Sequence, residues 1–226
     1  MIPKITALVP MRHHSQRVPR KNFRLIAGKP LFHFVIENLL QVPEISQIIV
    51  DTDSPEIMDG LTRYFPDVKI IERPVELRAD DLSMNEILLH DVMKTKEELF
   101  LQTHSTNPLV CPSTYSHAIQ KFHNNRDKFD SLFAVTRIQV RLWDSNGKPI
   151  NHDPRVLLQT QDLPPVYEEN SCFYIFSKEI LSARHNRLGE KPMMFEVDRD
   201  EAWDIDEEID FQIVELLLKN RETRKG

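Results

Sequence analysis

Glycine, cysteine and long apolar runs are all scarce in this sequence. Its 226 residues include five glycines and two cysteines. Neither G-x-G-x-x-G nor G-x-x-x-x-G-K-[ST] occurs, so the sequence indicates neither a dinucleotide-binding turn nor an ordinary P-loop. The two cysteines, Cys111 and Cys172, lie in unrelated contexts. This excludes a disulfide framework and the closely spaced ligand pairs of a zinc site.

The chain also lacks the apolar segments that membrane and secreted proteins carry. No run approaches the roughly 20 apolar residues of a membrane span, and the N-terminus has no long apolar signal core. We therefore expect no membrane partner and a cytoplasmic location. The net charge of -6 argues against bulk nucleic-acid binding. A hydrophobic fraction of 40% over 226 residues suits a single globular domain spanning residues 1–226.

Short apolar runs alternate with amphipathic segments along the chain. Strands are predicted at 5–9, 47–52, 67–74, 98–105, 130–138, 171–176 and 193–197. Helices are predicted at 29–42, 82–96, 113–123 and 206–220, the last burying Ile209, Ile213, Leu216 and Leu217. This order predicts an α/β fold, a mostly parallel sheet with helices on both faces. Residues 139–170 are polar, proline-punctuated and without periodicity, which indicates an arm or a small subdomain.

A basic loop follows the first predicted strand, in the stretch "VPMRHHSQRVPRKN" at residues 9–22. Ligands of such sheets bind beyond the carboxyl ends of the strands, which is where this loop is expected. The candidate phosphate ligands are Arg12, Arg17, Arg20 and Lys21. Ser15 adds a hydroxyl, and the amide of Asn22 could read a base edge. The alternative is a solvated basic loop held by surface ion pairs.

Two pairs of aspartates are candidate metal ligands. Asp204 and Asp206 in "WDID" are spaced to share a hard cation such as Mg2+, although Asp206 could instead be an N-cap. Asp51 and Asp53 form a D-x-D after a predicted strand, as in metal-dependent glycosyltransferases. For this second pair we favour an ordinary turn.

The loop motif resembles the opening motif of the acylneuraminate cytidylyltransferases, the CMP-sialic acid synthetases. The residues that match it in register are Pro10, Arg12, Ser15, Val18, Lys21 and Asn22. The resemblance continues, in the family's order, through residues 26–31, 48–57, 72–83, 99–109, 130–136, 161–176 and 204–211. It therefore covers nearly the whole chain.

The resemblance implies a Rossmann-like fold and a specific reaction. Residues 139–170 correspond to a dimerisation arm, so a homodimer is expected. The implied reaction transfers CMP from CTP to the anomeric hydroxyl of a 2-keto-3-deoxy sugar acid, a sialic-acid-like nonulosonate, and releases pyrophosphate. By this resemblance, Arg12 and Lys21 bind the triphosphate with Ser15 beside them, and Asn22 binds cytosine or nearby groups. Asp204 and Asp206 hold Mg2+. Gln102 and Tyr174 line the pocket of the acceptor sugar, with Arg73 and Ser83 nearby.

Most departures from the family pattern fall on the acceptor side. Arg187 and Leu188 stand where sialic acid enzymes carry two adjacent phenylalanines, and Thr160 stands where they carry an arginine. The loop "LQTHSTNPL" is about two residues longer than the common form. On the nucleotide side, His13 and His14 replace two small residues. We therefore expect Arg187 to meet a polar or acidic group on an acceptor other than N-acetylneuraminate.

Two other functions remain open at this point. A metal-dependent glycosyltransferase would consume a sugar nucleotide and need Asp51 and Asp53. A non-catalytic nucleotide-binding module would bind without turnover and tolerate changes at Asp204.

Overall fold

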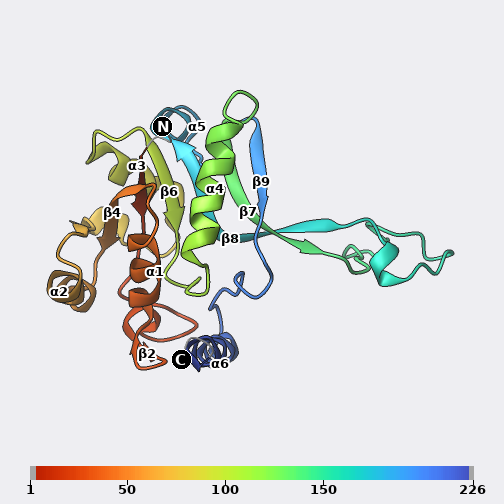
Figure 1. Cartoon of the computed structure of the whole chain (residues 1–226), viewed down its shortest axis with the longest axis horizontal. Coiled ribbons are helices and arrows are strands. Elements are labelled where there is room, and N and C mark those ends of the chain that lie inside the picture. Colours follow the sequence, from red (N-terminus) through yellow and green to blue (C-terminus); the bar gives the residue numbers. More distant parts are fainter. Residues whose placement is uncertain (1–3, 224–226) are drawn as a thin grey trace.

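The computed structural model describes residues 4–223, and its centre is a seven-stranded mixed sheet (Figure 1). In spatial order the strands are β5 (Lys69–Glu72), β4 (Ile45–Thr52), β1 (Ile5–Leu8), β6 (Leu99–Thr103), β8 (Val166–Ser177), β7 (Ser131–Ile138) and β9 (Pro192–Glu196). The first four strands are parallel, β8 is antiparallel to both neighbours, and β9 is parallel to β7. A separate hairpin pairs β2 (Leu25–Ile26) with β3 (Lys29–Pro30). The predicted mostly parallel sheet is confirmed.

Helices cover both faces of this sheet. One face packs against α1 (Leu31–Leu40), α2 (Pro55–Tyr64) and α4 (Pro112–Asn124), and the other against α3 (Met84–Met93) and α5 (Lys178–Arg184). The closing helix α6 (Glu208–Thr223) packs on a third cluster beneath α1. Single 3-10 turns occur at Lys21–Phe23, Val75–Leu77 and Thr160–Asp162. Within residues 4–223 no helix is long and apolar enough to cross a membrane.

Burial on both faces explains why the strand sequences are continuously apolar. Successive side chains point to opposite faces of a sheet. Ala7 and Leu101 therefore join the cluster beneath α1, whereas Leu8 and Phe100 join the cluster beneath α3. All four side chains are fully buried, so neither face favours a polar residue.

Two helices were missing from the sequence prediction. Helix α2 begins where a turn was expected, because the Ser54 hydroxyl accepts a hydrogen bond from the Ile57 amide and Pro55 fits the first turn. Helix α5 starts directly after β8, where the hydroxyl of Ser177 accepts from the amide of Ile180. Helix α5 spans only seven residues, too few for a clear periodic signal, whereas the first residues of α2 resemble a turn in sequence.

The prediction for the closing helix was right in place and partly wrong in face. Its buried side chains are Phe211, Val214 and Leu218, and the predicted Leu217 packs partly buried against the same cluster. Ile209 and Leu216, also predicted to be buried, are 59% and 61% exposed. The helix packs against the loop and hairpin that follow β1, and this tertiary contact selects the buried face.

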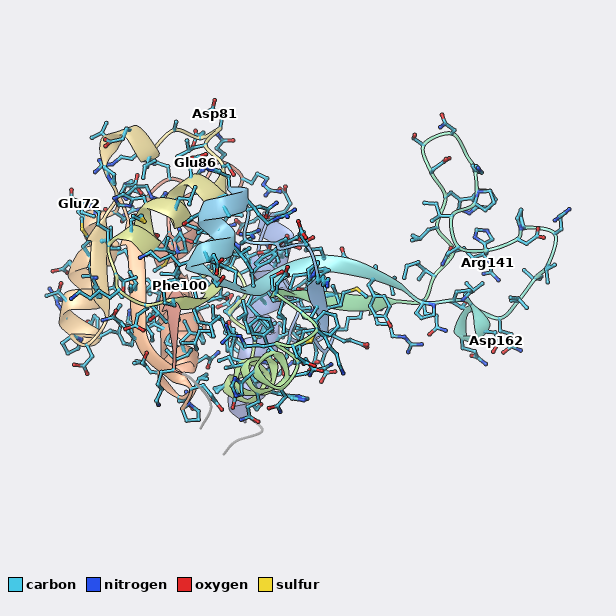
Figure 2. All side chains as sticks on the ribbon, turned by 90° about the horizontal axis from the view of Figure 1, so that it is seen from above. Glu72, Asp81, Glu86, Phe100, Arg141 and Asp162 are labelled. Carbon is cyan, nitrogen blue, oxygen red and sulfur yellow. The ribbon has the colours of Figure 1, made fainter. Side chains whose placement is uncertain are left out.

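A long hairpin projects from the body of the molecule (Figures 1 and 2). Strands β7 and β8 continue beyond the sheet, pairing as far as Ile138 with Val166, and residues 139–165 join them. Figure 2 shows Arg141 and Asp162 on this arm, far from Phe100 in the body. Strand β8 begins five residues before the predicted 171, because residues 166–170 pair with β7 although they carry charged side chains.

Candidate active site

The basic loop is anchored on the carboxyl ends of β1 and β4. The amide of Met11 donates to the carbonyl of Asp51 (2.8 Å), and the amide of His13 donates to the carboxylate of Asp53 (2.7 Å). Inside the loop, the side-chain amide of Asn22 donates to the carbonyl of Arg12 (2.7 Å). The other end of this amide accepts a hydrogen bond from Ser105 (2.7 Å), so Asn22 ties the loop to the end of β6.

The loop walls a polar cavity of about 280 Å³. The predicted nucleotide ligands Arg12, Ser15, Lys21 and Asn22 all line it, together with His14, Gln16, Arg17, Asp80, His104, Ser105 and Thr106. The guanidinium of Arg12 contacts the carboxylate of Asp80 at 3.2 Å, and the amide of Gln16 donates to the same carboxylate at 3.0 Å. Asp80 thus pairs with Arg12, a cation that an anionic ligand would meet.

The two ends of the chain meet beside this cavity. Ile205 is fully buried and holds the segment of Asp204 and Asp206 in place. The ammonium of Lys21 donates to the carbonyl of Ile205 and lies 3.9 Å from the carboxylate of Asp206. Arg17 donates to Asp206 at 2.6 Å. Residues more than 180 positions apart in sequence therefore form one charged site.

Burial shifts the pKa values of the innermost charges. Desolvation lowers the pKa of Lys21, although the carboxylates of Asp204 and Asp206 partly oppose this. Desolvation raises the pKa of Asp204, and the charge of Asp206 raises it further. The Oδ1 atom of Asp204 is buried and has no hydrogen-bond partner among the described residues. Such an orphaned carboxylate oxygen is a ready ligand for a cation.

A second cavity of about 450 Å³ adjoins the aspartates. Asp204 and Asp206 line it together with Thr136, Glu168, Glu169, Asn170, Ser171, Arg199, Ala202 and Trp203. The backbone of Ser171 is left-handed (φ 56°), and the pairing of β7 with β8 shifts register nearby. This bulge lets Glu169 and Tyr174, an odd number of residues apart on one strand, face each other: the Tyr174 hydroxyl donates to Glu169.

Gln102, Tyr174 and Arg187, which we call the acceptor cluster, are brought together next to His104, which lines the first cavity, and Glu169, which lines the second. The guanidinium of Arg187 lies 3.6 Å from the ring centre of Tyr174 and donates to the Gln102 side-chain oxygen at 2.6 Å. Gln102 comes from β6, Tyr174 from β8 and Arg187 from the loop after α5. Burial lowers the pKa of Arg187 from its very high ordinary value and raises that of Tyr174, so both keep their usual charge at neutral pH.

The other two predicted substrate residues lie elsewhere. Arg73 is 1% exposed and ion-paired with Asp51 in the core. The Ser83 hydroxyl caps α3, accepting from the amide of Asn85 at 3.2 Å. Neither residue lines the two cavities that the described residues enclose here. Their contact with substrate stays a prediction.

Asp51 and Asp53 do not form a shared metal site. Asp51 points into the core toward Arg73, whereas Asp53 holds the backbone of the basic loop. Asp51, His90 and Asp91 do offer three ligand atoms within 4.8 Å. However, the guanidinium of Arg73 already lies against this group, and burial together with the Asp51 charge raises the pKa of Asp91 to about 9. A carboxyl that keeps its proton at neutral pH is a poor metal ligand.

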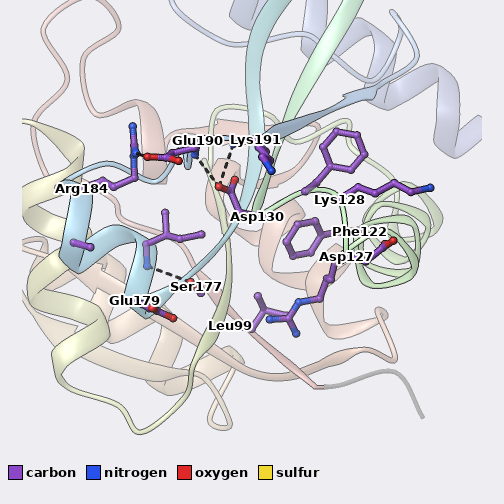
Figure 3. Close-up of a pocket in the computed structure, with 14 residues that line it drawn as sticks. Leu99, Phe122, Asp127, Lys128, Asp130, Ser177, Glu179, Arg184, Glu190 and Lys191 are labelled. Atoms are coloured by element: carbon purple, nitrogen blue, oxygen red, sulfur yellow. Dashed lines mark hydrogen bonds and ion pairs between the residues drawn. The ribbon is translucent and has the colours of Figure 1, made fainter.

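A third cavity, of about 600 Å³, lies at the opposite ends of β6 and β8, and Figure 3 shows its lining residues. Its charged lining residues are Arg126, Lys128, Arg184 and Lys191 with Asp127, Asp130, Glu179 and Glu190. The signs balance. Arg184 is paired with Glu190 at 3.0 Å, and Asp130 accepts the amides of Glu190 and Lys191. Nothing in this hollow favours an anionic substrate.

Sequence reasoning missed two residues of the site, Asp80 and Glu169, because only tertiary contacts reveal their partners. Asp80 meets Arg12 across 68 residues, and Glu169 meets Tyr174 only because β8 contains a bulge. His104 was among the polar side chains of the loop "LQTHSTNPL" that can hydrogen-bond a hydroxylated ligand, but the sequence did not single it out from its neighbours.

Comparison with known proteins gives a consistent result along the chain. A family model described as cytidylyltransferase matches residues 6–223. The CMP-N,N'-diacetyllegionaminic acid synthase of Legionella pneumophila is 28% identical over 96% of this chain and 97% of its own. The pseudaminic acid cytidylyltransferase of Campylobacter jejuni is 23% identical over 96% and 97%. The N-acylneuraminate cytidylyltransferase of Escherichia coli is 25% identical over all of this chain but 54% of its own length.

Solved structures share the fold at low sequence identity. A CMP:2-keto-3-deoxy-manno-octonic acid synthetase complexed with CTP superposes with a TM-score of 0.72 and 18% identity, covering 96% of this chain and 99% of its own. A 4-diphosphocytidyl-2C-methyl-D-erythritol synthase from Anaerococcus prevotii gives a TM-score of 0.69 and 13% identity, covering 96% of each chain. The predicted Rossmann-like α/β architecture is therefore confirmed.

Proposed function

This chain belongs to the cytidylyltransferase family, and from that premise we propose that it transfers CMP from CTP to a 2-keto-3-deoxy sugar acid of the nonulosonate class. The anomeric hydroxyl of the acceptor attacks the α-phosphorus of CTP. A phosphorus–oxygen bond forms, the bond to the β-phosphate bridge breaks, and pyrophosphate leaves. One observation carries this proposal: Lys21 and Arg17 of the first loop meet Asp206 near the far end of the chain beside a polar cavity.

The nucleotide binds, in this proposal, in the 280 Å³ cavity. Arg12 and Lys21 contact the triphosphate, and Ser15 donates a hydroxyl hydrogen bond. Phosphoryl transfer of this kind depends on positioning and charge neutralisation, which two fixed cations supply. Both ends of the Asn22 amide are engaged within the protein, which supports a role in shaping the loop rather than reading cytosine directly.

Mg2+ is the metal that the residues fit. Asp204 and Asp206 offer hard oxygen ligands in the lining of the 450 Å³ cavity, and the orphaned Oδ1 of Asp204 lacks any other partner among the described residues. When bound there, the ion supplies positive charge to the phosphate oxygens. Lys21 lies 3.9 Å from the carboxylate of Asp206, so its ammonium lies next to the place where the ion would bind.

The acceptor binds, in this proposal, against the acceptor cluster. Gln102 and Tyr174 are buried and hold the guanidinium of Arg187 in place, and this guanidinium matches a carboxylate or another polar group of the sugar acid. Glu169 and Ser171 connect Tyr174 to the 450 Å³ cavity beside the aspartates. A cation where related sialic acid enzymes are apolar supports an acceptor other than N-acetylneuraminate.

The arm is proposed to pair two copies of the chain as a homodimer. Its exposed apolar side chains include Trp143 (50%), Ile150 (61%), Val156 (54%) and Leu157 (90%). This surface is too sparse to form a core of its own. Light scattering of the full chain at high micromolar concentration should give twice the monomer mass, and Leu157→Asp should shift it toward the monomer. A monomer mass for the unchanged chain would refute the proposal.

A pyrophosphate-release screen tests the function. The purified chain is incubated with CTP, Mg2+ and a panel of 2-keto sugar acids, with each substrate omitted in turn. Release that requires both CTP and a sugar acid supports the proposal. Nucleotide binding without release would favour a non-catalytic module, and consumption of a CMP-sugar in place of CTP would favour a glycosyltransferase.

A further inference from the structure

His104 lies between the nucleotide cavity and the acceptor cluster. It follows β6 and lines the 280 Å³ cavity together with Lys21. On its other side, its Nε2 atom lies 2.9 Å from the Nε2 atom of Gln102. The imidazole thus lines the proposed nucleotide cavity and contacts Gln102 of the acceptor cluster.

The contacts of Gln102 fix the orientation of its amide. Its nitrogen lies 3.1 Å from the carbonyl of Thr103, and its oxygen accepts from Arg187 at 2.6 Å. A reversed amide would turn its NH2 group toward the guanidinium of Arg187 and its oxygen toward a carbonyl. Neither contact could be a hydrogen bond, because donor would face donor and acceptor would face acceptor.

The tautomer of His104 follows from that orientation. The NH2 group of Gln102 has one hydrogen on the Thr103 carbonyl and the other directed at Nε2 of His104. Nε2 must therefore accept, which requires a neutral ring with its proton on Nδ1. Burial and the neighbouring cations Arg187 and Lys21 lower the pKa of His104 to about 3, so the neutral ring is the form present at neutral pH.

We infer that His104 is a positioning residue for acceptor specificity: by accepting from Gln102, it holds the Gln102 oxygen on Arg187 and so fixes that guanidinium over Tyr174. The inference rests on the proposed function, because Arg187 is there the group that meets the sugar acid. His104 acts through Gln102, so its loss should weaken acceptor binding far more than nucleotide binding.

A double-mutant cycle tests this route of action. The variants are His104→Leu, Arg187→Met and the two combined, assayed by pyrophosphate release with the best sugar acid from the panel. His104→Leu should raise the KM for the sugar acid about fivefold to tenfold, with the KM for CTP changed less than about twofold. In the Arg187→Met background the same change should have little further effect, because the residue it positions is gone.

A second pair of variants guards against a simple folding defect. In His104→Gln the side-chain oxygen can replace Nε2 as acceptor, so the acceptor KM should stay close to that of the unchanged enzyme. In His104→Asn the amide ends near the place of Nδ1 and is too short to reach Gln102, so the loss should match that of His104→Leu. His117→Leu, on the exposed side of α4, is the matched control and should behave like the unchanged enzyme.

The outcomes separate the inference from the function on which it rests. Equal losses from His104→Leu with and without Arg187, an effect mainly on the KM for CTP, or equal defects in His104→Gln and His104→Asn would each overturn the inference alone. An unchanged enzyme that releases no pyrophosphate with any sugar acid would overturn the proposed function and the inference together.

Discussion

The nucleotide side and the acceptor side of this site hold their charges in opposite ways. On the nucleotide side, the side chains of Arg12 and Asp80 are 33% and 64% exposed, and Arg17 and Asp206 are similarly open to solvent. On the acceptor side, Arg187 is stacked on Tyr174 and bonded to the buried amide of Gln102. Exposed ion pairs are weak and can be exchanged for a charged ligand, whereas a packed network presets one geometry.

This difference suggests a division of tasks. The nucleotide side can release Arg12 from Asp80 when a triphosphate arrives, at little cost in free energy. We propose that the acceptor side selects its substrate by shape and by a cation fixed in advance. The predictions below test the two halves separately.

The largest effect is expected from Lys21→Ala. It removes a cation that is desolvated and aimed at the proposed triphosphate, so turnover should fall about a hundredfold to a thousandfold. Steady-state pyrophosphate release at saturating CTP measures this. Lys128→Ala is the control. This exposed lysine lines neither the 280 Å³ nor the 450 Å³ cavity, so the variant should retain full activity. A loss of less than about threefold in Lys21→Ala would remove the lysine from the reaction.

A smaller and more selective effect is expected from Arg187→Phe. The change restores an aromatic residue where sialic acid enzymes carry one and removes the cation. We expect kcat/KM for the enzyme's preferred sugar acid to fall about tenfold, and the relative use of N-acetylneuraminate to rise. Competition between the two sugar acids, followed by the CMP-sugars formed, measures the ratio. If the unchanged enzyme already prefers N-acetylneuraminate, the assignment of Arg187 is wrong.

The smallest effect is on stability and concerns the buried cluster beneath the basic loop. Asp91 has a pKa of about 9 in the folded chain and an ordinary value near 4 when unfolded. The folded state therefore binds a proton that the unfolded state releases, and stability from this group is lost as pH rises from about 4 toward 9. Asp91→Asn does not titrate and keeps a donor toward Asp51.

Urea unfolding at pH 6 and pH 8 tests this sign. The free energy of unfolding of Asp91→Asn, relative to the unchanged chain, should rise by at least about 1 kcal/mol between the two pH values. Asp127→Asn, at an exposed position, should show no such change. A relative stability that does not change between pH 6 and pH 8 would mean that Asp91 is already ionised in the folded chain at both pH values.

The same contrast explains how much the sequence could predict. The nucleotide side depends on one contiguous loop and one short aspartate segment, so a motif found Arg12, Lys21, Asp204 and Asp206 and the structure brings them together. The acceptor residues Gln102, Tyr174 and Arg187 were found through the family pattern, but their mutual contacts were not. Those contacts depend on a bulge in β8 and on an amide orientation, neither of which leaves a periodic signal.

The fold shows a similar limit. Strands that are buried on both faces are recognisable in the sequence as apolar runs, and the order of these runs along the chain predicted the sheet. The buried face of α6 did not follow from its own sequence, because apolar side chains occur all round that helix and its neighbours select among them. Short helices such as α5 are fixed by a cap and by their place in the chain.

The central claim is that charges from both ends of the chain act on one Mg2+–triphosphate complex, and titration of pyrophosphate release with Mg2+ tests it most directly. Asp204→Asn keeps the size of the side chain but removes a ligand charge, so turnover should fall strongly at low Mg2+ and recover in part as Mg2+ rises. Lys21→Ala should show no recovery, while the melting temperatures of both variants stay close to that of the unchanged chain. Near-normal turnover of Asp204→Asn at every Mg2+ concentration would contradict the account and leave residues 204–206 as a structural segment before α6.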